Sequence, residues 1–157
     1  MNLSVKDDID SSAELMSRLT CDLGKTCLNK EHFFAAKYNL TPAEFRCLRL
    51  FNNKLSMSIK RIAVQMNLTP GRITHILTSL EAKKYIERKI DQKDKRNIIV
   101  HLTDSSIPFL KQVNENHIKL HENILNNLPE DKREFIIESM EELIKALKTW
   151  TDNSKRN

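Results

Sequence analysis

The chain of 157 residues contains only two glycines and four prolines. Most tight turns require one of these residues, so their scarcity disfavours a fold built from many short strands and loops. No apolar run approaches the ~20 residues that a membrane-spanning helix needs. The first fifteen residues also lack the basic start and apolar stretch of a secretory signal. We therefore expect a largely helical, cytoplasmic protein without a membrane partner.

Motifs for catalysis and metal binding are also scarce. Cys21, Cys27 and Cys47 have no paired spacing, which favours reduced structural thiols over disulfides. There is no phosphate-binding glycine loop, nucleophile elbow or paired Cys/His motif, so we expect neither an enzyme nor a cofactor. His117 and His121 have a spacing that can hold zinc when a third ligand converges, but the sequence fixes no third ligand. Packed or interface histidines are the favoured interpretation, with no metal.

Charge is unevenly distributed along the chain. The composition of 39% hydrophobic and 30% charged residues is typical of a globular protein, and the formal net charge is +5. The segment 69–102 contains eight Lys or Arg and four Asp or Glu, whereas the segment 130–148 contains six acids and four bases. The excess positive charge is therefore concentrated in one segment, which permits a nucleic-acid partner there.

That segment begins with a predicted helix. Thr69 is a suitable N-cap, and Pro70 suits the first helical position, where its missing N–H costs nothing. Apolar residues recur at helical spacing and predict one buried stripe: Ile73, Ile76, Leu77 and Leu80. The remaining face carries side chains that can donate hydrogen bonds to base edges, and small residues that allow close approach. These candidate DNA-binding residues are Thr69, Gly71, Arg72, Thr74, His75, Thr78 and Ser79.

Two β-prone runs, 85–90 and 97–102, follow this helix and enclose a highly charged turn. Lys93, Lys95 and Arg96 are candidates for contact with DNA, and Lys83 is a candidate for contact with phosphate. Asp94 would repel phosphate, so we expect it to stabilise the hairpin by accepting hydrogen bonds within the protein. A helix followed by a basic β-hairpin is the winged helix-turn-helix arrangement, which indicates DNA binding.

These residues resemble the MarR family of bacterial transcriptional regulators. The similarity is carried by Leu68-Thr69-Pro70, Ile73-Thr74, Leu80-Glu81, Ile86-Glu87-Arg88, Asp91-x-x-Asp94-Lys95-Arg96 and Val100-x-Leu102-Thr103, and upstream by Leu40-Thr41-Pro42-Ala43-Glu44-Phe45. The family usually has Arg, Asp and Gly where this chain has His75, Thr78 and Lys84. The last difference places a side chain where the turn after the helix prefers a positive φ.

The resemblance implies a mainly helical homodimer with a small β-hairpin wing. The predicted division is an N-terminal dimerisation helix within 1–36, a winged helix-turn-helix domain at 37–103, and C-terminal dimerisation helices at 104–157. The first helix is predicted from about residue 11, after a frayed acidic segment, the second from Pro42 to about Asn52, and the third after Ser58. Long helices to about Leu128 and from Pro129 to about Trp150 carry apolar stripes. Packing within one chain would also explain these stripes, but the resemblance favours a dimer interface.

The implied function is a sequence-specific transcriptional regulator, expected to be a repressor, that binds double-stranded DNA at a near-palindromic operator. In the family, small aromatic or amphipathic effectors bind between the dimerisation helices and the DNA-binding lobe. Phe33, Phe34, Phe51 and Phe109 are candidates to line such a cavity, although each also fits a hydrophobic core. Two alternatives remain: a thiol-based redox-sensing regulator of the same fold, and a winged-helix module for protein–protein contact. The basic wing argues against the latter.

Overall fold

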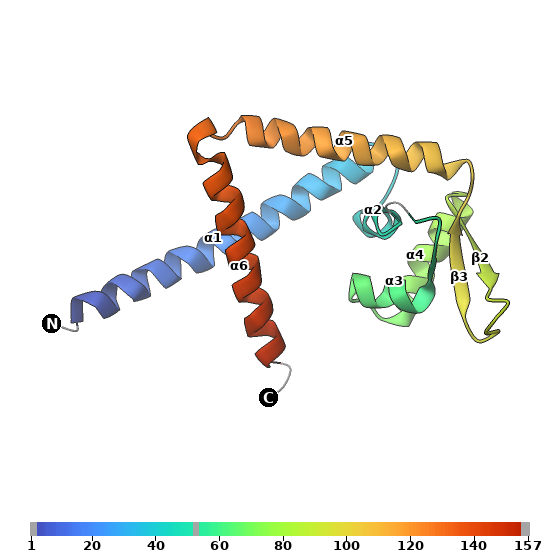
Figure 1. Cartoon of the computed structure of the whole chain (residues 1–157), viewed down its shortest axis with the longest axis horizontal. Helices are drawn as coiled ribbons and strands as arrows, with labels where there is room; N and C mark the ends of the chain where they lie inside the picture. The colour runs from blue at the N-terminus through green and yellow to red at the C-terminus, as the bar shows by residue number, and fades with distance from the viewer. Residues whose placement is uncertain (1–2, 52–53, 155–157) are drawn as a thin grey trace. The chain divides into compact units, whose positions relative to one another are not determined.

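The structure, a computed structural model, describes residues 3–51 and 54–154, with side chains from residue 11 onward (Figure 1). The elements, in chain order, are α1 Leu3–Ala36, α2 Pro42–Arg49, β1 Ser56–Ser58, α3 Ile59–Met66, α4 Pro70–Ala82, β2 Ile86–Ile90, β3 Ile98–Leu102, α5 Ser106–Asn126, the short 3-10 helix η1 Glu130–Lys132 and α6 Arg133–Ser154. They form two compact units, Met1–Val113 and Asn114–Asn157. The predicted fold class, mainly helical with a small β wing, is confirmed.

Several predicted boundaries need correction. The first helix begins at Leu3, so the prediction of a frayed segment before residue 11 is wrong. The second ends at Arg49, and its predicted end at Asn52 lies outside the described residues. The last helix is preceded by η1 and runs to Ser154 instead of ending near Trp150. These differences are at element ends, where sequence signals are weakest.

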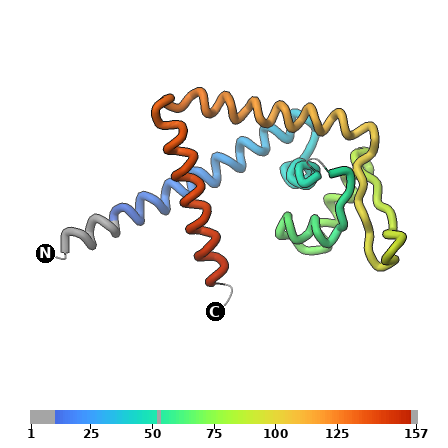
Figure 2. The backbone as a smooth tube through the Cα atoms, viewed as in Figure 1, coloured from blue at the N-terminus to red at the C-terminus, as the bar shows by residue number. Residues whose placement is uncertain are grey.

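A third strand, β1, was not predicted. It pairs antiparallel with β3, with Met57 opposite Val100, and β3 pairs antiparallel with β2, with Arg88 also opposite Val100. The strand order is therefore β1-β3-β2, and the turn that joins β2 to β3 lies at the lower right of the tube in Figure 2. β1 ends at Ser58, whose hydroxyl accepts a hydrogen bond from the Arg61 amide and so caps α3.

The core of the first unit joins the winged helix to both of its neighbouring helices. The α4 stripe is buried as predicted, with Ile73, Leu77 and Leu80 fully inaccessible to solvent. Phe34 and Ala35 at the end of α1 are also buried, and so are Leu110 and Val113 in the first half of α5. The end of α1 and the first half of α5 therefore contribute to the core of the first unit. The division of the chain at residues 36 and 103 stays a prediction.

Among the residues that the structure describes, three other than glycine have a positive φ: Asn39, Asn67 and Lys84, at 53°, 51° and 63°. Asparagine tolerates this left-handed region because its short polar side chain bonds locally, but lysine has no such compensation. Lys84 follows α4, at the position where the sequence indicated that a positive φ is preferred. The turn is retained because the Lys84 amide donates to the Glu81 carbonyl and the Tyr85 amide donates to the Leu80 carbonyl.

We expect Lys84→Gly to stabilise the protein. Glycine adopts this φ without a Cβ clash, and the gain of about 0.5–1 kcal/mol corresponds to a melting temperature higher by roughly 1–4 °C for a chain of this size. Thermal unfolding followed by circular dichroism measures the shift. Lys111→Gly, at an exposed position inside α5, is the control and should lower the melting temperature. A lower melting temperature for both variants would contradict the strain at Lys84.

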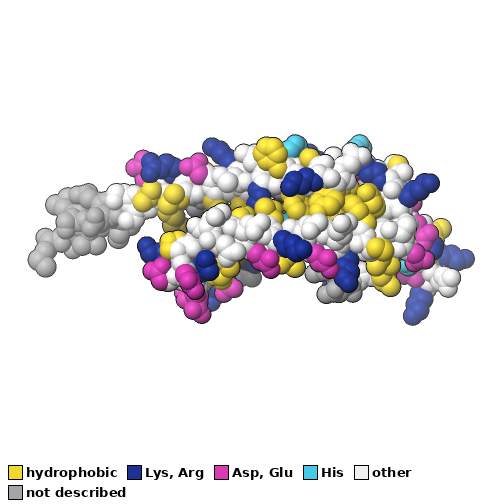
Figure 3. All heavy atoms as spheres, turned by 90° about the horizontal axis from the view of Figure 1, so that it is seen from above, with side chains coloured by type: hydrophobic (Ala, Val, Ile, Leu, Met, Phe, Trp, Pro, Cys, Tyr) yellow, Lys and Arg dark blue, Asp and Glu magenta, His cyan; other side chains and the backbone are white. Residues whose placement is uncertain are grey.

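The long helices expose much apolar surface. In α6, Phe135, Met140, Leu147 and Trp150 are between 42% and 70% exposed, and α1 exposes Leu19 and Leu28 to a similar degree. Hydrophobic side chains are visible at the surface of the face drawn in Figure 3. None of the helices in the described part of the chain is long and apolar enough to cross a membrane. Among the described residues, these side chains of α1 and α6 are therefore exposed apolar surface.

Candidate nucleic-acid interface

The polar face of α4 is open to solvent. Arg72, Thr74, His75 and Thr78 are exposed, and a Cβ added to Gly71 would meet no atom within 4 Å. The Thr74 hydroxyl donates to the Pro70 carbonyl at 3.0 Å, which leaves its oxygen available as an acceptor. Arginine, histidine and threonine side chains on one exposed helix face can read the edges of base pairs in a major groove. These four side chains are exposed, and their contact with DNA stays a prediction.

Thr69 precedes this helix with extended backbone angles, φ −67° and ψ 153°, as an N-cap residue should. Its side chain, however, makes no capping hydrogen bond, so the predicted cap is correct in position but not in its bond. The amides of the first turn of α4 have no side-chain acceptor at Thr69. A phosphate oxygen placed there would find donors and the positive end of the helix.

Two predicted DNA-binding residues are engaged inside the protein instead. Ser79 is half-buried and its hydroxyl donates to Glu44 Oε1 at 2.6 Å. Lys83 Nζ donates to Glu44 Oε2 and to the Asn39 carbonyl, both at 2.8 Å. Glu44 is itself only 2% exposed. In this arrangement the Ser79 and Lys83 side chains both donate to Glu44 of α2, so they make contacts within the protein in place of the predicted contacts with DNA.

Glu44 also completes the cap of α2. Its Oε2 accepts from the Thr41 amide at 2.7 Å, while the Thr41 hydroxyl accepts from the Glu44 amide at 3.2 Å, a capping box. Burial acts to raise the pKa of Glu44, but hydrogen bonds from Lys83, Ser79 and Thr41 together outweigh burial and lower that pKa. The carboxylate is therefore held in its ionised form.

Because the pKa of Glu44 is lower in the folded state, we expect its stabilising contribution to depend on pH. It should be fully present above the unfolded value of 4.5 and be lost as the pH falls through the lower folded value. Urea unfolding of wild type and Glu44→Gln at pH 7, 5 and 3 measures this contribution. The stability advantage of wild type should be largest at pH 7 and shrink at pH 3. An advantage that does not change with pH would contradict this account.

A second carboxylate joins α4 to the wing. Glu81 Oε2 accepts from Arg88 Nε at 3.0 Å and from the other end of the guanidinium at 2.5 Å, and Glu81 Oε1 accepts from the Arg88 amide at 3.1 Å. The Arg88 guanidinium lies 3.4 Å from the Thr78 hydroxyl. Side-chain hydrogen bonds from Arg88 lower the pKa of Glu81. Glu81 of α4 thus holds Arg88 of β2, although this chain has Thr78 where the family usually has Asp.

The wing turn is organised by its aspartates. Asp94 Oδ1 accepts from the Arg96 amide at 3.0 Å, and Asp94 Oδ2 accepts from the Asn97 side chain at 2.9 Å. Asp91 Oδ1 accepts from the Lys93 amide at 2.9 Å. Lys93, Lys95 and Arg96 are all exposed. The acids are therefore bonded within the turn, while the three cations of the turn project from it.

The four candidate effector-binding phenylalanines do not share one environment. Phe34 is 6% exposed and packs against Tyr38 and Phe45, with ring centroids 5.3 Å apart in each pair. Phe51 is buried, and Phe109 stacks on Tyr85 at 4.7 Å. Phe33 is 74% exposed. Phe34 and Phe51 are core residues here, so the exposed Phe33 and the half-buried Phe109 remain as candidates.

Among the described residues, the cysteines and histidines do not form a metal-binding cluster. Burial raises the pKa of the Cys47 thiol to about 12, so this thiol is not a reactive thiolate, while Cys21 and Cys27 are exposed. The His121 ring nitrogen Nδ1 lies 2.8 Å from the His117 carbonyl. No group of three potential metal ligands occurs in the part of the chain that the structure describes.

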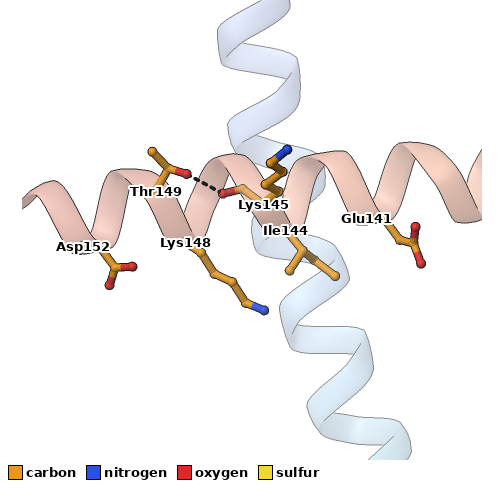
Figure 4. Close-up of a pocket in the computed structure, with 6 residues that line it drawn as sticks. All are labelled: Glu141, Ile144, Lys145, Lys148, Thr149 and Asp152. Atoms are coloured by element: carbon orange, nitrogen blue, oxygen red, sulfur yellow. Dashed lines mark hydrogen bonds between the residues drawn. The ribbon is translucent and has the colours of Figure 1, made fainter.

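A surface hollow of about 380 Å³ lies along α6 (Figure 4). Its lining residues all belong to this helix: Glu141, Ile144, Lys145, Lys148, Thr149 and Asp152. A dashed line in Figure 4 marks the bond from the Thr149 hydroxyl to the Lys145 carbonyl, which is internal to the helix. A hollow lined by one helix face is not an enclosed effector cavity.

Comparisons with known proteins agree with this geometry. Residues 40–98 match the family model "MarR family". The regulator SarZ of Staphylococcus haemolyticus is 26% identical over 123 residues, which are 76% of this chain and 80% of SarZ. Streptococcus pneumoniae FabT, in a crystal structure with DNA, has a TM-score of 0.75 at 18% identity and covers 88% of this chain and 99% of its own.

An Escherichia coli MarR mutant, solved in complex with operator DNA, has a TM-score of 0.70 at 21% identity, over 84% of this chain and 92% of its own. These likenesses in structure extend the fold agreement beyond the matched residues 40–98 to the flanking helices. The matched segment contains the exposed face of α4 and most of the β2–β3 hairpin. Residues 40–98 therefore form a MarR-type winged helix-turn-helix segment, the segment of a family of DNA-binding transcriptional regulators.

Proposed function

We propose that this regulator binds specific double-stranded DNA with α4 in the major groove. The observation that carries the proposal is the open polar face of α4, from Gly71 to Thr78, beside a wing whose cations project outward. Arg72, Thr74 and His75 are the proposed base contacts, and Thr69 and Gly71 the proposed phosphate contacts at the helix start. FabT and the Escherichia coli MarR mutant were crystallised with DNA, which supports the same partner here.

We further propose that the protein acts as a homodimer and a repressor. The apolar stripes of α1 and α6 are exposed in the described part of the chain, and a second copy would cover them. A two-fold dimer presents two copies of α4 to successive major grooves, so the operator should be a near-palindrome with half-site centres ~10 bp apart or a small multiple of it. A dimer over a promoter would block polymerase, which favours repression.

Selection of bound duplexes from a random pool tests this proposal. We expect enrichment of a near-palindromic site whose two halves are related by two-fold symmetry. Recovery of unrelated sequences at low salt, with binding that disappears at physiological salt, would indicate only non-specific attraction to phosphate. That outcome would favour the alternative of a winged helix used for protein contact.

The wing should contribute affinity without sequence preference. Replacing Lys95 and Arg96 together with Ala should weaken binding to all duplexes and lower the slope of log affinity against log salt by about one unit for each phosphate that the wing no longer neutralises. Fluorescence anisotropy at several salt concentrations measures the slope. Lys111→Ala combined with Lys119→Ala is the control, because it removes the same charge from two exposed positions of α5. An unchanged slope in the wing variant would place both side chains in solvent.

Release from DNA by a small apolar ligand is also part of the proposal. Phe33 is exposed near the end of α1, and Phe109 is half-buried near the start of α5. A ligand that favours a different spacing of the two α4 helices must weaken DNA binding by the same factor by which DNA weakens ligand binding. Two experiments distinguish release by a ligand from release by thiol oxidation. In the first, aromatic acids are titrated against the DNA complex. In the second, the wild-type protein and a triple Cys→Ser variant are treated with peroxide. If peroxide releases the wild-type protein from DNA but not the Cys→Ser variant, the result would favour a thiol switch.

A further inference from the structure

The turn between α1 and α2 is bonded directly to the end of the recognition helix. Asn39 adopts the left-handed conformation in this turn, which is closed by bonds from the amides of Tyr38 and Leu40 to the Ala35 carbonyl. This geometry leaves the Asn39 carbonyl to accept a hydrogen bond from Lys83 Nζ at 2.8 Å, across 44 positions of sequence. Lys83 is the C-cap residue of α4. One side chain therefore links the end of α1 to the end of α4.

Glu44 ties the same end of α4 to α2. Its two oxygens accept from three groups: Lys83 Nζ, the Ser79 hydroxyl and the Thr41 amide. Ser79 and Lys83 are four residues apart, so they lie on one face of α4. Among the described residues, no buried side-chain nitrogen or oxygen lacks a hydrogen-bond partner. The buried charge of Glu44 is therefore satisfied, and bonds of this kind are strongly directional.

We propose that Glu44 and Lys83 are positioning residues that set the orientation of α4 toward DNA; this inference rests on the proposed function of α4 as the base-reading helix. The apolar stripe alone holds α4 by non-directional contacts, which allow small rotations and tilts. The three bonds at Ser79 and Lys83 fix the azimuth and tilt of the helix from its C-terminal end.

The effect of such a bond should be amplified along the helix. Arg72 lies eleven residues before Lys83, or about 16 Å at 1.5 Å per residue. A tilt of roughly 5° about the C-terminal end would move the start of the helix by about 1.4 Å. Displacements of this size break bidentate hydrogen bonds to a base, which need close geometry. Removal of either positioning residue should therefore reduce discrimination between sequences more than it reduces attraction to phosphate.

The charge of Glu44 separates this role from simple electrostatics. If the cluster acted on DNA only through charge, Glu44→Gln would remove a negative charge and strengthen binding to every duplex. Positioning predicts the opposite sign, namely weaker binding to the selected site. Lys83→Met removes the partner of Glu44 at a half-exposed position and keeps most of the side-chain volume. Lys84→Met is the control for removal of one positive charge at the neighbouring residue.

The test uses the full chain with two probes: the duplex enriched by wild type and a mixed-sequence duplex of equal length. We expect Glu44→Gln and Lys83→Met each to weaken binding to the enriched duplex about five- to tenfold, and the double variant to be no worse than either single variant. Binding to the mixed duplex should change no more than in Lys84→Met. Lys83→Arg, which keeps the charge and the donors, should restore most of the specific affinity.

Amide hydrogen exchange without DNA provides an independent measurement. The amides of Lys83, Lys84 and Tyr85 close the C-terminal end of α4, so they should exchange faster in Glu44→Gln and Lys83→Met than in Lys84→Met. Unchanged exchange would overturn the inference even if wild type binds DNA. Tighter binding of DNA by Glu44→Gln would also overturn it. So would a double variant whose loss of affinity equals the sum of the two single losses, together with a lower salt slope in Lys83→Met. A wild-type protein without sequence preference would instead contradict the proposed function, while exchange would still decide whether these bonds hold α4.

Discussion

Replacing Leu147 and Trp150 with Lys should convert the protein to a monomer and lower its affinity for the selected duplex at least a hundredfold. Both side chains are apolar and substantially exposed on α6, at 42% and 70%. A dimer binds two half-sites at once, and this second binding event raises the apparent affinity by roughly 10²–10⁴ without any additional bond to DNA from either protomer. Two lysines on each protomer would meet two more at a two-fold interface and prevent it from forming.

Sedimentation at micromolar concentration and fluorescence anisotropy measure the two effects together. The control is Thr149→Lys combined with Glu142→Gln, which changes the net charge by the same amount. At 100° per residue, these two positions lie about 80° to 160° around the helix from Leu147 and Trp150. The control should remain dimeric and bind as wild type does. A lysine variant that stays dimeric would place the interface elsewhere, and a monomer with full affinity would contradict the proposed two-fold binding.

The second large effect should come from Arg72→Ala. Arg72 is exposed in the first turn of α4, where a recognition helix meets base edges. One bidentate contact to guanine is worth about 1–3 kcal/mol, and a dimer loses it twice, so the affinity for the selected duplex should fall by about 2–6 kcal/mol. A second selection from the random pool should then enrich sites with relaxed preference at one position in each half.

Arg72→Lys distinguishes base reading from contact with phosphate. Lysine keeps the charge but lacks the planar pair of donors that matches guanine, so it should restore attraction to phosphate and not the sequence preference. If Arg72→Lys binds the selected duplex as tightly as wild type does, Arg72 contacts the backbone and the base-reading assignment fails.

The sequence predicted the elements that have strong local signals. The spacing of Ile73, Leu77 and Leu80 indicated the buried side of α4, and Thr41-Pro42 indicated where α2 begins. The charged turn between two β-prone runs indicated the hairpin. The resemblance of short motifs to the MarR family identified the fold and the family, because those motifs contain the residues that shape the helix and the wing.

Long-range contacts could not be predicted in this way. The bonds of Glu44 to Ser79 and Lys83 span 35 and 39 positions and leave no periodic signal in the sequence. For the same reason Ser79 and Lys83 were expected to face DNA, as polar residues on a helix usually face solvent. β1 is three residues long and pairs with β3 across more than forty positions, so no local pattern revealed it.

Photocrosslinking to the selected duplex tests the central claim most directly. A photoreactive phenylalanine analogue in place of His75 should crosslink to bases in the major groove of both half-sites at symmetric positions. The same analogue in place of Lys95, on the wing, should crosslink outside those base pairs, and in place of Lys111, on α5, it should give no symmetric product. Symmetric crosslinks from position 75 are the result this account predicts. Crosslinks from position 111 that equal or exceed those from position 75 would show that another surface meets DNA and would contradict it.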